Sequence, residues 1–122
     1  MADRDAPLRG DAVCVLTSGG LDSGVLIAEI AKEFSQVHPV YIRCGLFWEQ
    51  AERYWLRRFL KKLHTRHRHL QPLKILSMDL REIYGDHWSL TGKNVPPYHS
   101  DDFEVYLPGR NIILLAKTAV YC

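Results

Sequence analysis

The sequence has 122 residues, 47% of them hydrophobic and 25% charged, which suits one compact domain with a modest core and is too little for two. The 16 Lys and Arg residues against 14 Asp and Glu residues leave a net charge of +2, which excludes a global positive field that would recruit nucleic acid or an anionic membrane. The N-terminus lacks the apolar region of a signal peptide and no run reaches the length of a membrane span, so we expect no targeting signal.

The first elements are a strand and a helix. We expect residues 1–10 to be a flexible N-terminus and 11–122 to form one nucleotide-binding domain. Residues 11–17 (DAVCVLT) are short and almost continuously apolar, as is typical of a strand buried on both faces of a parallel sheet. In residues 23–35 the apolar side chains recur at helical spacing up to Phe34, which predicts an amphipathic helix.

A second strand and helix follow. Residues 38–44 (HPVYIRC) read as a strand and 48–63 as a helix. The apolar stripe predicted for this helix consists of Trp48, Trp55, Leu56, Phe59, Leu60 and Leu63.

The remaining elements are a third strand at 73–80, a short extended piece at 104–108 and a helix at 111–122. Between them, 85–102 is a long polar stretch, which we interpret as either a lid or a connector; in a lid, Trp88 could stack on a base and His87 or Lys93 could contact an anion. Strands that alternate with helices predict an α/β fold, a doubly wound parallel sheet with helices on both faces.

The turn between the first strand and the first helix, Ser18-Gly19-Gly20-Leu21-Asp22-Ser23, predicts an anion site. Two glycines let the backbone approach a ligand, and consecutive N–H groups can then converge on it at the positive end of the helix. Ser18 and Ser23 add hydroxyl donors. The alternative is a tight turn in which Asp22 or Ser23 caps the helix. The stretch matches neither the GxxxxGK[ST] nor the GxGxxG pattern.

This segment resembles the SGGxDS signature of the PP-loop ATP pyrophosphatases. The resemblance implies an adenine nucleotide α-hydrolase-like, Rossmann-like fold, cleavage of ATP between the α and β phosphates, and pyrophosphate held by residues 18–23. AMP is transferred to a carboxyl or carbonyl oxygen and then displaced by a nitrogen or sulfur nucleophile.

A second segment narrows the family. Residues 106–122 (YLPGRNIILLAKTAVYC) resemble the [VL]PxRN segment, continuing into an apolar helix, of the 7-cyano-7-deazaguanine synthases (QueC). By that resemblance the substrates are 7-carboxy-7-deazaguanine, ammonia and ATP, and the product is the nitrile of queuosine biosynthesis, formed in the cytoplasm. Another PP-loop ligase, a tRNA-modifying enzyme and a non-catalytic nucleotide-binding module remain alternatives.

We expect Asp22 and Arg110 to take part in catalysis, Asp22 as a direct or water-mediated ligand of Mg²⁺ and Arg110 as the group that grips a phosphate or substrate carboxylate. Gly109 lies beside Arg110 at the carboxyl edge of the sheet, where ligands bind in open α/β folds. Arg43, at the end of the second strand, is either a further site residue or part of a surface salt bridge. Arg110 could likewise pair with a nearby acid.

The sequence departs from the family at two places. Residues 43–52 (RCGLFWEQAE) stand where typical synthases carry a Gln-Arg-His stretch, which suggests a divergent branch. The family's C-terminal cysteine cluster, which holds zinc, has no counterpart before Cys122, so we expect a domain that lacks its last strands.

Other motifs favour structural interpretations. The basic run 57–71 reads as a solvated helix face and a polar loop rather than a tRNA contact, so we expect no direct nucleic-acid partner. The nearby His64, His67 and His69 lack an acid or cysteine partner, and we predict no protein metal site. The oligomeric state stays open, and a homodimer is one possibility.

The three cysteines (Cys14, Cys44, Cys122) show no CxxC spacing and fit a reducing compartment. Burial of the first two would argue against sulfur transfer, because that chemistry needs a reactive thiol.

Overall fold

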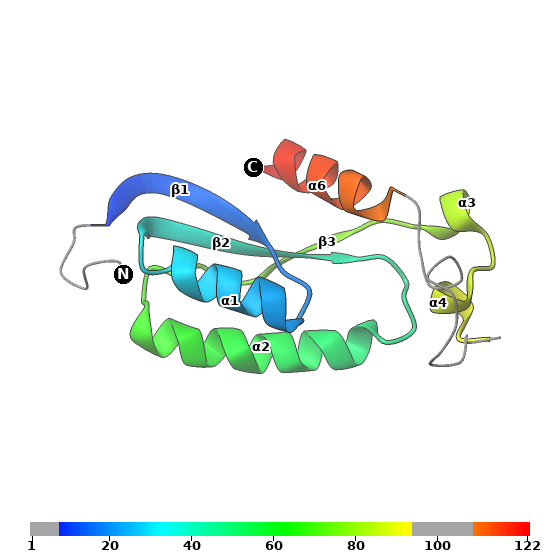
Figure 1. Cartoon of the computed structure of the whole chain (residues 1–122), viewed down its shortest axis with the longest axis horizontal. Coiled ribbons are helices and arrows are strands. Elements are labelled where there is room, and N and C mark those ends of the chain that lie inside the picture. Colours follow the sequence, from blue (N-terminus) through cyan, green and yellow to red (C-terminus); the bar gives the residue numbers. More distant parts are fainter. Residues whose placement is uncertain (1–7, 94–108) are drawn as a thin grey trace.

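The computed structural model describes residues 8–93 and 109–122. Its elements run in the order β1 (Arg9–Leu16), α1 (Leu21–Ile30), β2 (Phe34–Arg43), α2 (Glu49–Arg66), β3 (Lys74–Ser77), α3 (Arg81–Tyr84), α4 (Trp88–Thr91) and α6 (Arg110–Tyr121) (Figure 1).

The three strands form one parallel sheet in the order β1-β2-β3. Leu16 pairs with Val40 near the end of β1, and Arg43 pairs with Ser77 at the ends of β2 and β3. The carboxyl ends of all three strands therefore lie at one edge, and the residues that follow them are delivered to the same end of the molecule.

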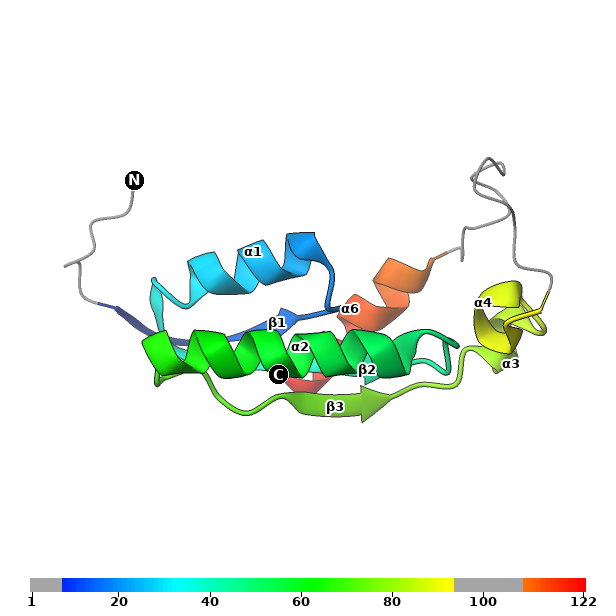
Figure 2. The ribbon, with the colours of Figure 1, turned by 90° about the horizontal axis from the view of Figure 1, so that it is seen from below.

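Helices cover both faces of the sheet, as predicted for this α/β fold. Figures 1 and 2 show α1 and α2 on one face and α6 on the other. Alternate residues of β2 serve the two layers: Val40 and Ile42 pack with Leu114 of α6, whereas Val37 and Tyr41 pack on the side of α1 and α2. The central strand is thus buried from both directions, which explains its nearly continuous apolarity.

The first helix is shorter than predicted. It ends at Ile30, and Phe34 belongs to β2, whose start precedes the predicted one at 38. The amide of Lys32 donates to Glu29 and that of Glu33 to Ile30, which closes a tight turn, and the amide of Arg9 then donates to Glu33. Phe34 fits the helical spacing, but pairing with β1 decides its conformation.

The second helix is confirmed and extends to Arg66, but its predicted apolar stripe is wrong at two positions. Leu56 and Leu60 are buried, whereas Trp55 is 61% and Phe59 39% exposed. The stripe that meets the sheet is narrower than the apolar stripe in the sequence.

The later elements differ from the prediction mainly in their ends. The third strand is limited to β3. Its pairing with β2 ends at Ser77, and the Met78 amide then donates to the Arg43 carbonyl oxygen. Part of the predicted loop 85–102 is helical, as α4. The predicted helix at 111–122 is confirmed as α6, while the extended piece at 104–108 lies outside the described residues.

Candidate nucleotide-binding site

The end of β1 is anchored at Thr17, immediately before the loop. Its amide and its hydroxyl both donate to the carbonyl oxygen of Val40, at 2.7 and 2.9 Å, and its side chain is buried. The chain therefore leaves the sheet from a rigid position, and residues 18–22 project into solvent.

The two predicted serines meet across the loop. Ser23 Oγ accepts from the Ser18 amide at 3.2 Å, lies 3.3 Å from Ser18 Oγ and donates to the Gly20 carbonyl at 3.3 Å, while the Gly20 amide donates to Ser18 Oγ at 3.3 Å. These bonds hold the loop curved before any ligand arrives, which is the preorganisation that an anion site needs.

The start of α1 contradicts the capping alternative. The N-cap is Gly20, with extended backbone angles and no side-chain cap, and Leu21, Asp22 and Ser23 form the first helical turn. Because neither Asp22 nor Ser23 caps the helix, no side-chain acceptor among residues 8–93 and 109–122 competes with an anion for the amides of this turn, and the helix dipole favours negative charge there.

Gly19 is constrained by α2 as well as by its own backbone. Its φ is +81°, and a Cβ at this position would lie 2.9 Å from the carbonyl oxygen of Glu52. The loop is therefore packed against the first turn of α2, and only glycine fits between them.

A cavity of about 470 Å³ borders the loop between α1 and α2. It is mainly apolar, and its walls include Gly20, Ser23, Val25, Trp55 and Phe59. This size is in the range of small-molecule sites. Trp55 and Phe59, which are exposed and were predicted as part of the buried stripe of α2, therefore line the cavity beside the loop.

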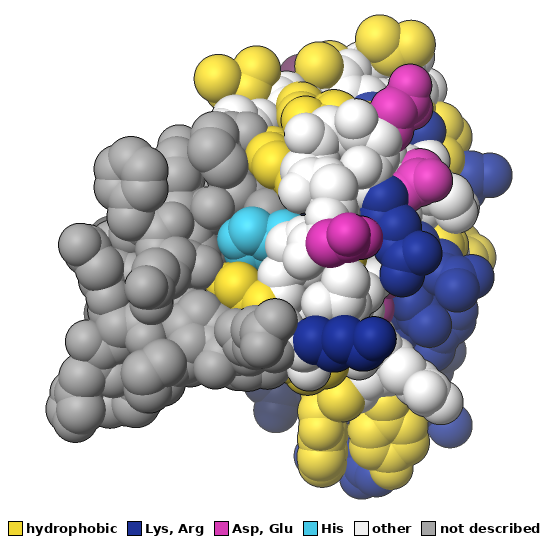
Figure 3. All heavy atoms as spheres, turned by 90° about the vertical axis from the view of Figure 1, so that its right-hand side faces the viewer, with side chains coloured by type: hydrophobic (Ala, Val, Ile, Leu, Met, Phe, Trp, Pro, Cys, Tyr) yellow, Lys and Arg dark blue, Asp and Glu magenta, His cyan; other side chains and the backbone are white. Residues whose placement is uncertain are grey.

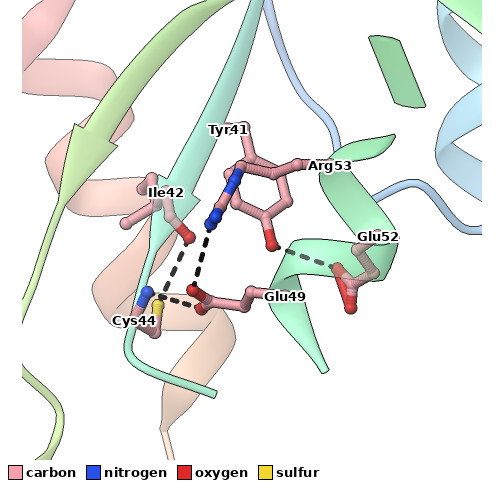
Figure 4. A network of polar contacts seen from close by, with 6 residues as sticks. All are labelled: Tyr41, Ile42, Cys44, Glu49, Glu52 and Arg53. Carbon is pink, nitrogen blue, oxygen red and sulfur yellow. Dashed lines mark hydrogen bonds and ion pairs between the residues drawn. The ribbon is translucent and has the colours of Figure 1, made fainter. Parts of the chain in front are cut away.

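A buried acid organises the link between β2 and α2. Glu49 is 4% exposed; one carboxylate oxygen accepts from the Cys44 amide at 2.6 Å, and the other lies 3.7 Å from Arg53 Nη1 (Figure 4). Sequence reasoning missed this residue, although an acid in the first turn of a helix after a buried strand is a recognisable signal.

Tyr41 and Glu52 add a second polar pair beside it. The Tyr41 hydroxyl donates to Glu52 at 3.4 Å (Figure 4). Burial raises the pKa of Glu52, against a hydrogen bond from the Trp48 side chain, the charge of Arg110 and the bond from Tyr41. Burial, then the charge of Glu52, raises the pKa of Tyr41. Sequence reasoning missed this pair too.

Arg110 reaches the same network from the opposite layer. It opens α6 directly after Gly109, whose φ is +72°, and its Nε is buried with no hydrogen-bond partner among residues 8–93 and 109–122. Its charge acts on both Glu52 and Cys44. The structure thus brings Arg110 near Glu52 of α2 and Cys44, with a donor left for an added acceptor.

Cys44 is buried, which disfavours its thiolate form. Burial and Glu49 raise its pKa to about 11, although Arg110 acts in the opposite direction. The half-buried Cys14 has its pKa raised to about 11 as well, by burial and by Cys122. Because the thiolate is the nucleophile, these two cysteines argue against sulfur transfer.

Arg43 is not brought into this network. Its side chain is exposed, and none of the ion pairs within the described part of the chain involves it. His87 has a local role: its Nδ1 accepts from the Ser89 amide and caps α4.

The histidines near the end of α2 have backbone partners. His64 Nδ1 lies 3.0 Å from the Leu70 carbonyl oxygen and His69 Nε2 lies 2.6 Å from that of Ala31. Burial, and after it the charge of the neighbouring His69, lowers the pKa of His67. The described residues contain no group of three or more His, Cys, Asp or Glu side chains placed to hold a metal ion.

The basic run after Trp55 is solvated: the side chains of Arg57, Arg58, Lys61 and Lys62 are exposed. Figure 3, which faces the end of the molecule that carries α3 and α4, shows Lys and Arg interspersed with Asp and Glu among the described side chains. No helix in the described ranges combines the length and apolarity that a membrane crossing requires.

Comparison with known proteins gives one family. The family model described as "Queuosine biosynthesis protein QueC" matches residues 11–122. Relatives include proteins described as 7-cyano-7-deazaguanine synthase in Prochlorococcus marinus strain MIT 9215 (26% identical over 117 residues) and strain MIT 9312 (28% over 122 residues). A protein described as 7-cyano-7-deazaguanine synthase 1 in Desulfitobacterium hafniense strain Y51 is 30% identical over 112 residues.

These alignments cover 93%, 93% and 89% of this chain but 50%, 50% and 49% of the relatives. The chain thus spans about half the length of the curated relatives it matches. No solved structure matches it significantly.

Proposed function

The chain belongs to the QueC family, and from this premise we propose that it binds ATP through residues 18–23 and forms part of an enzyme that converts 7-carboxy-7-deazaguanine to 7-cyano-7-deazaguanine. In this reaction the substrate carboxylate attacks the α-phosphorus of ATP, pyrophosphate leaves, and ammonia displaces AMP to give the amide. A second adenylation, now at the amide oxygen, allows elimination of AMP and yields the nitrile.

The observation that carries the proposal is the uncapped, curved loop at the start of α1. Its serine hydroxyls and first-turn amides offer hydrogen-bond donors that would stabilise the charge developing on the leaving pyrophosphate. The proposed reaction therefore needs no side chain that acts as a nucleophile. Arg110, with a buried donor that lacks a partner among the described residues, is suited to the substrate carboxylate or a phosphate. Arg43 stays a prediction as a cofactor-binding residue.

The donor set fits a magnesium ion held largely by phosphates. Asp22 is exposed in the first turn of α1, next to the proposed phosphate site. Mg²⁺ commonly takes one or two protein carboxylates together with nucleotide oxygens and water, so one aspartate suffices. When bound, the ion would neutralise phosphate charge, and Asp22 would be its protein ligand.

Nucleotide binding is tested by calorimetry of Mg-ATP with the 122-residue chain. Ser23→Ala removes a hydroxyl that organises the loop, and we expect about tenfold weaker binding, equivalent to about 1.4 kcal/mol. Thr65→Ala, a hydroxyl change at the far end of α2, should have no effect. Equal affinity in both variants would contradict the role of the loop.

Turnover separates the proposed reaction from the alternatives. Release of pyrophosphate and AMP that depends on 7-carboxy-7-deazaguanine and ammonia supports the synthase. Release with a tRNA or another acid supports a different PP-loop enzyme. ATP binding without turnover supports a nucleotide-binding module. The cytoplasmic location, the ammonia partner and a homodimer stay predictions.

A further inference from the structure

Three aromatic rings from two distant parts of the chain meet at the carboxyl end of the sheet. Phe47 and Trp48 lie between β2 and α2, and Trp88 opens α4. Their ring centroids are 5.1 Å apart for Phe47 and Trp48, 5.7 Å for Trp48 and Trp88, and 6.3 Å for Phe47 and Trp88. We call these three residues the aromatic cluster. Tertiary structure alone assembles it, because Trp88 is remote in sequence.

The cluster keeps an accessible aromatic surface within the described part of the chain. Phe47 is 52% exposed, whereas Trp48 and Trp88 are half-buried. Gly92, with φ +72°, passes so near that its Cβ would lie 3.6 Å from the Phe47 ring. The ring is therefore held from behind by backbone and indoles, and a large part of it remains open for a planar partner.

A single residue of α2 joins this cluster to the phosphate loop. The Trp48 side chain acts on the Glu52 carboxylate and lowers its pKa, in opposition to burial. The carbonyl oxygen of the same Glu52 would lie 2.9 Å from a Cβ at Gly19. The charge of Arg110 acts on the same carboxylate. An aromatic surface, a cation and the proposed anion-binding loop are thus grouped around the first turn of α2.

This combination suits a planar heterocycle that carries an anionic group. Stacking of a base on an aromatic side chain strengthens binding and tolerates different bases, because each has a π-face. Phe47 and Trp48 also fall within 43–52, where the sequence departs from the pattern it otherwise resembles. The cluster is therefore a candidate for the ligand contacts that this chain makes in place of the Gln-Arg-His stretch.

We propose that Phe47, supported by Trp48 and Trp88, is a stacking surface for a purine-like base. The inference rests on the proposed function, which names two ligands with such a base. They are the substrate, through its deazapurine, and ATP, through its adenine.

The test measures the affinity of the 122-residue chain for 7-carboxy-7-deazaguanine and for Mg-ATP, separately, by calorimetry. Phe47→Leu keeps an apolar side chain but removes the π-face, and we expect about tenfold weaker binding of one ligand. Loss for the acid alone assigns the surface to the deazapurine, and loss for ATP alone assigns it to adenine. Phe34→Leu, the same change at the opposite end of β2, should alter neither affinity, and Phe47→Tyr should retain wild-type binding.

Unchanged affinity for both ligands in a folded Phe47→Leu variant overturns the inference. A wild-type measurement tests it independently of folding: contacts between ligand base protons and Phe47 ring protons in NMR spectra support it, and their absence in a saturated complex contradicts it. If Ser23→Ala weakens ATP binding while Phe47→Leu changes nothing, the proposed function stands and only the stacking surface fails. If wild type binds neither ligand, both fail.

Discussion

At the scale of single residues, Gly19 is where the loop and α2 meet. Its positive φ disfavours any side chain, and a Cβ here would lie only 2.9 Å from the Glu52 carbonyl oxygen, so backbone angle and packing impose the same requirement. The sequence pattern explains the glycines of this loop by the approach of a ligand to the backbone. Here one of them is also required by packing, so its replacement should damage the fold before any ligand is added.

We therefore expect Gly19→Ala to lower the free energy of unfolding by about 2 kcal/mol, because alanine is strained at positive φ and its methyl group must displace a backbone carbonyl. Urea denaturation without nucleotide measures this loss. Gly24→Ala is the matched control: its Cβ would meet the Phe59 ring at an ordinary 3.7 Å inside α1, so stability should rise by about 0.5 kcal/mol. A Gly19→Ala variant as stable as wild type would contradict the close packing.

At the scale of elements, α2 has two different apolar surfaces. Leu56 and Leu60 pack on the sheet, whereas Trp55 and Phe59 turn toward the cavity beside the loop. The guanidinium of Arg58 lies 5.5 Å from the Trp55 ring centroid and partly covers this exposed residue. One helix thus holds the sheet with one face and shapes the candidate site with the next.

Adjacent substitutions in α2 should separate these surfaces. Leu56→Ala removes a side chain that is 2% exposed, and we expect a loss of about 2–4 kcal/mol in the free energy of unfolding. Trp55→Ala should cost less than about 1 kcal/mol, since that ring is mostly in solvent. Thermal or urea unfolding of both variants measures the difference. A larger loss at Trp55 than at Leu56 would show that the helix is rotated about its axis.

At the scale of the whole molecule, β2 joins two apolar layers. Each layer contains a titratable side chain whose neutral form is favoured in the folded state. Cys44 belongs to the layer that includes α6, and Tyr41 to the layer under α1 and α2. Burial raises the pKa of both side chains. Because a raised pKa in the folded state favours the protonated form, stability from these groups is present at neutral pH and is lost as pH rises.

For Cys44 the relevant window lies between its ordinary pKa of 9.0 and its folded value of about 11. We expect the free energy of unfolding to fall by up to about 2 kcal/mol over this window, as measured by urea denaturation at several pH values. Cys44→Ala should be less stable at pH 7 but should decline less steeply. Cys122→Ala, which removes an exposed thiol, should keep the part of this pH-dependent loss of stability that Cys44 causes. An equally steep decline in Cys44→Ala would mean that other groups cause it.

The sequence by itself determined the order β1, α1, β2, α2, β3 and α6, the doubly wound α/β class, the family and the position of the loop at residues 18–23, but it did not predict the short helices α3 and α4. The features that it determined depend on neighbouring residues: apolar periodicity, paired glycines and a local motif. It was less accurate at Phe34, whose spacing fits a helix although pairing with β1 makes it a strand residue.

Only the tertiary structure decided which distant groups share the candidate site. The contact of Gly19 with Glu52, the approach of Arg110 to Glu52 and Cys44, and the meeting of Phe47 and Trp48 with Trp88 join segments that the sheet topology brings to one edge. Periodicity reports which side of an element is apolar, but not which apolar side chain meets the sheet and which lines a cavity. That choice depends on the angle at which whole elements pack.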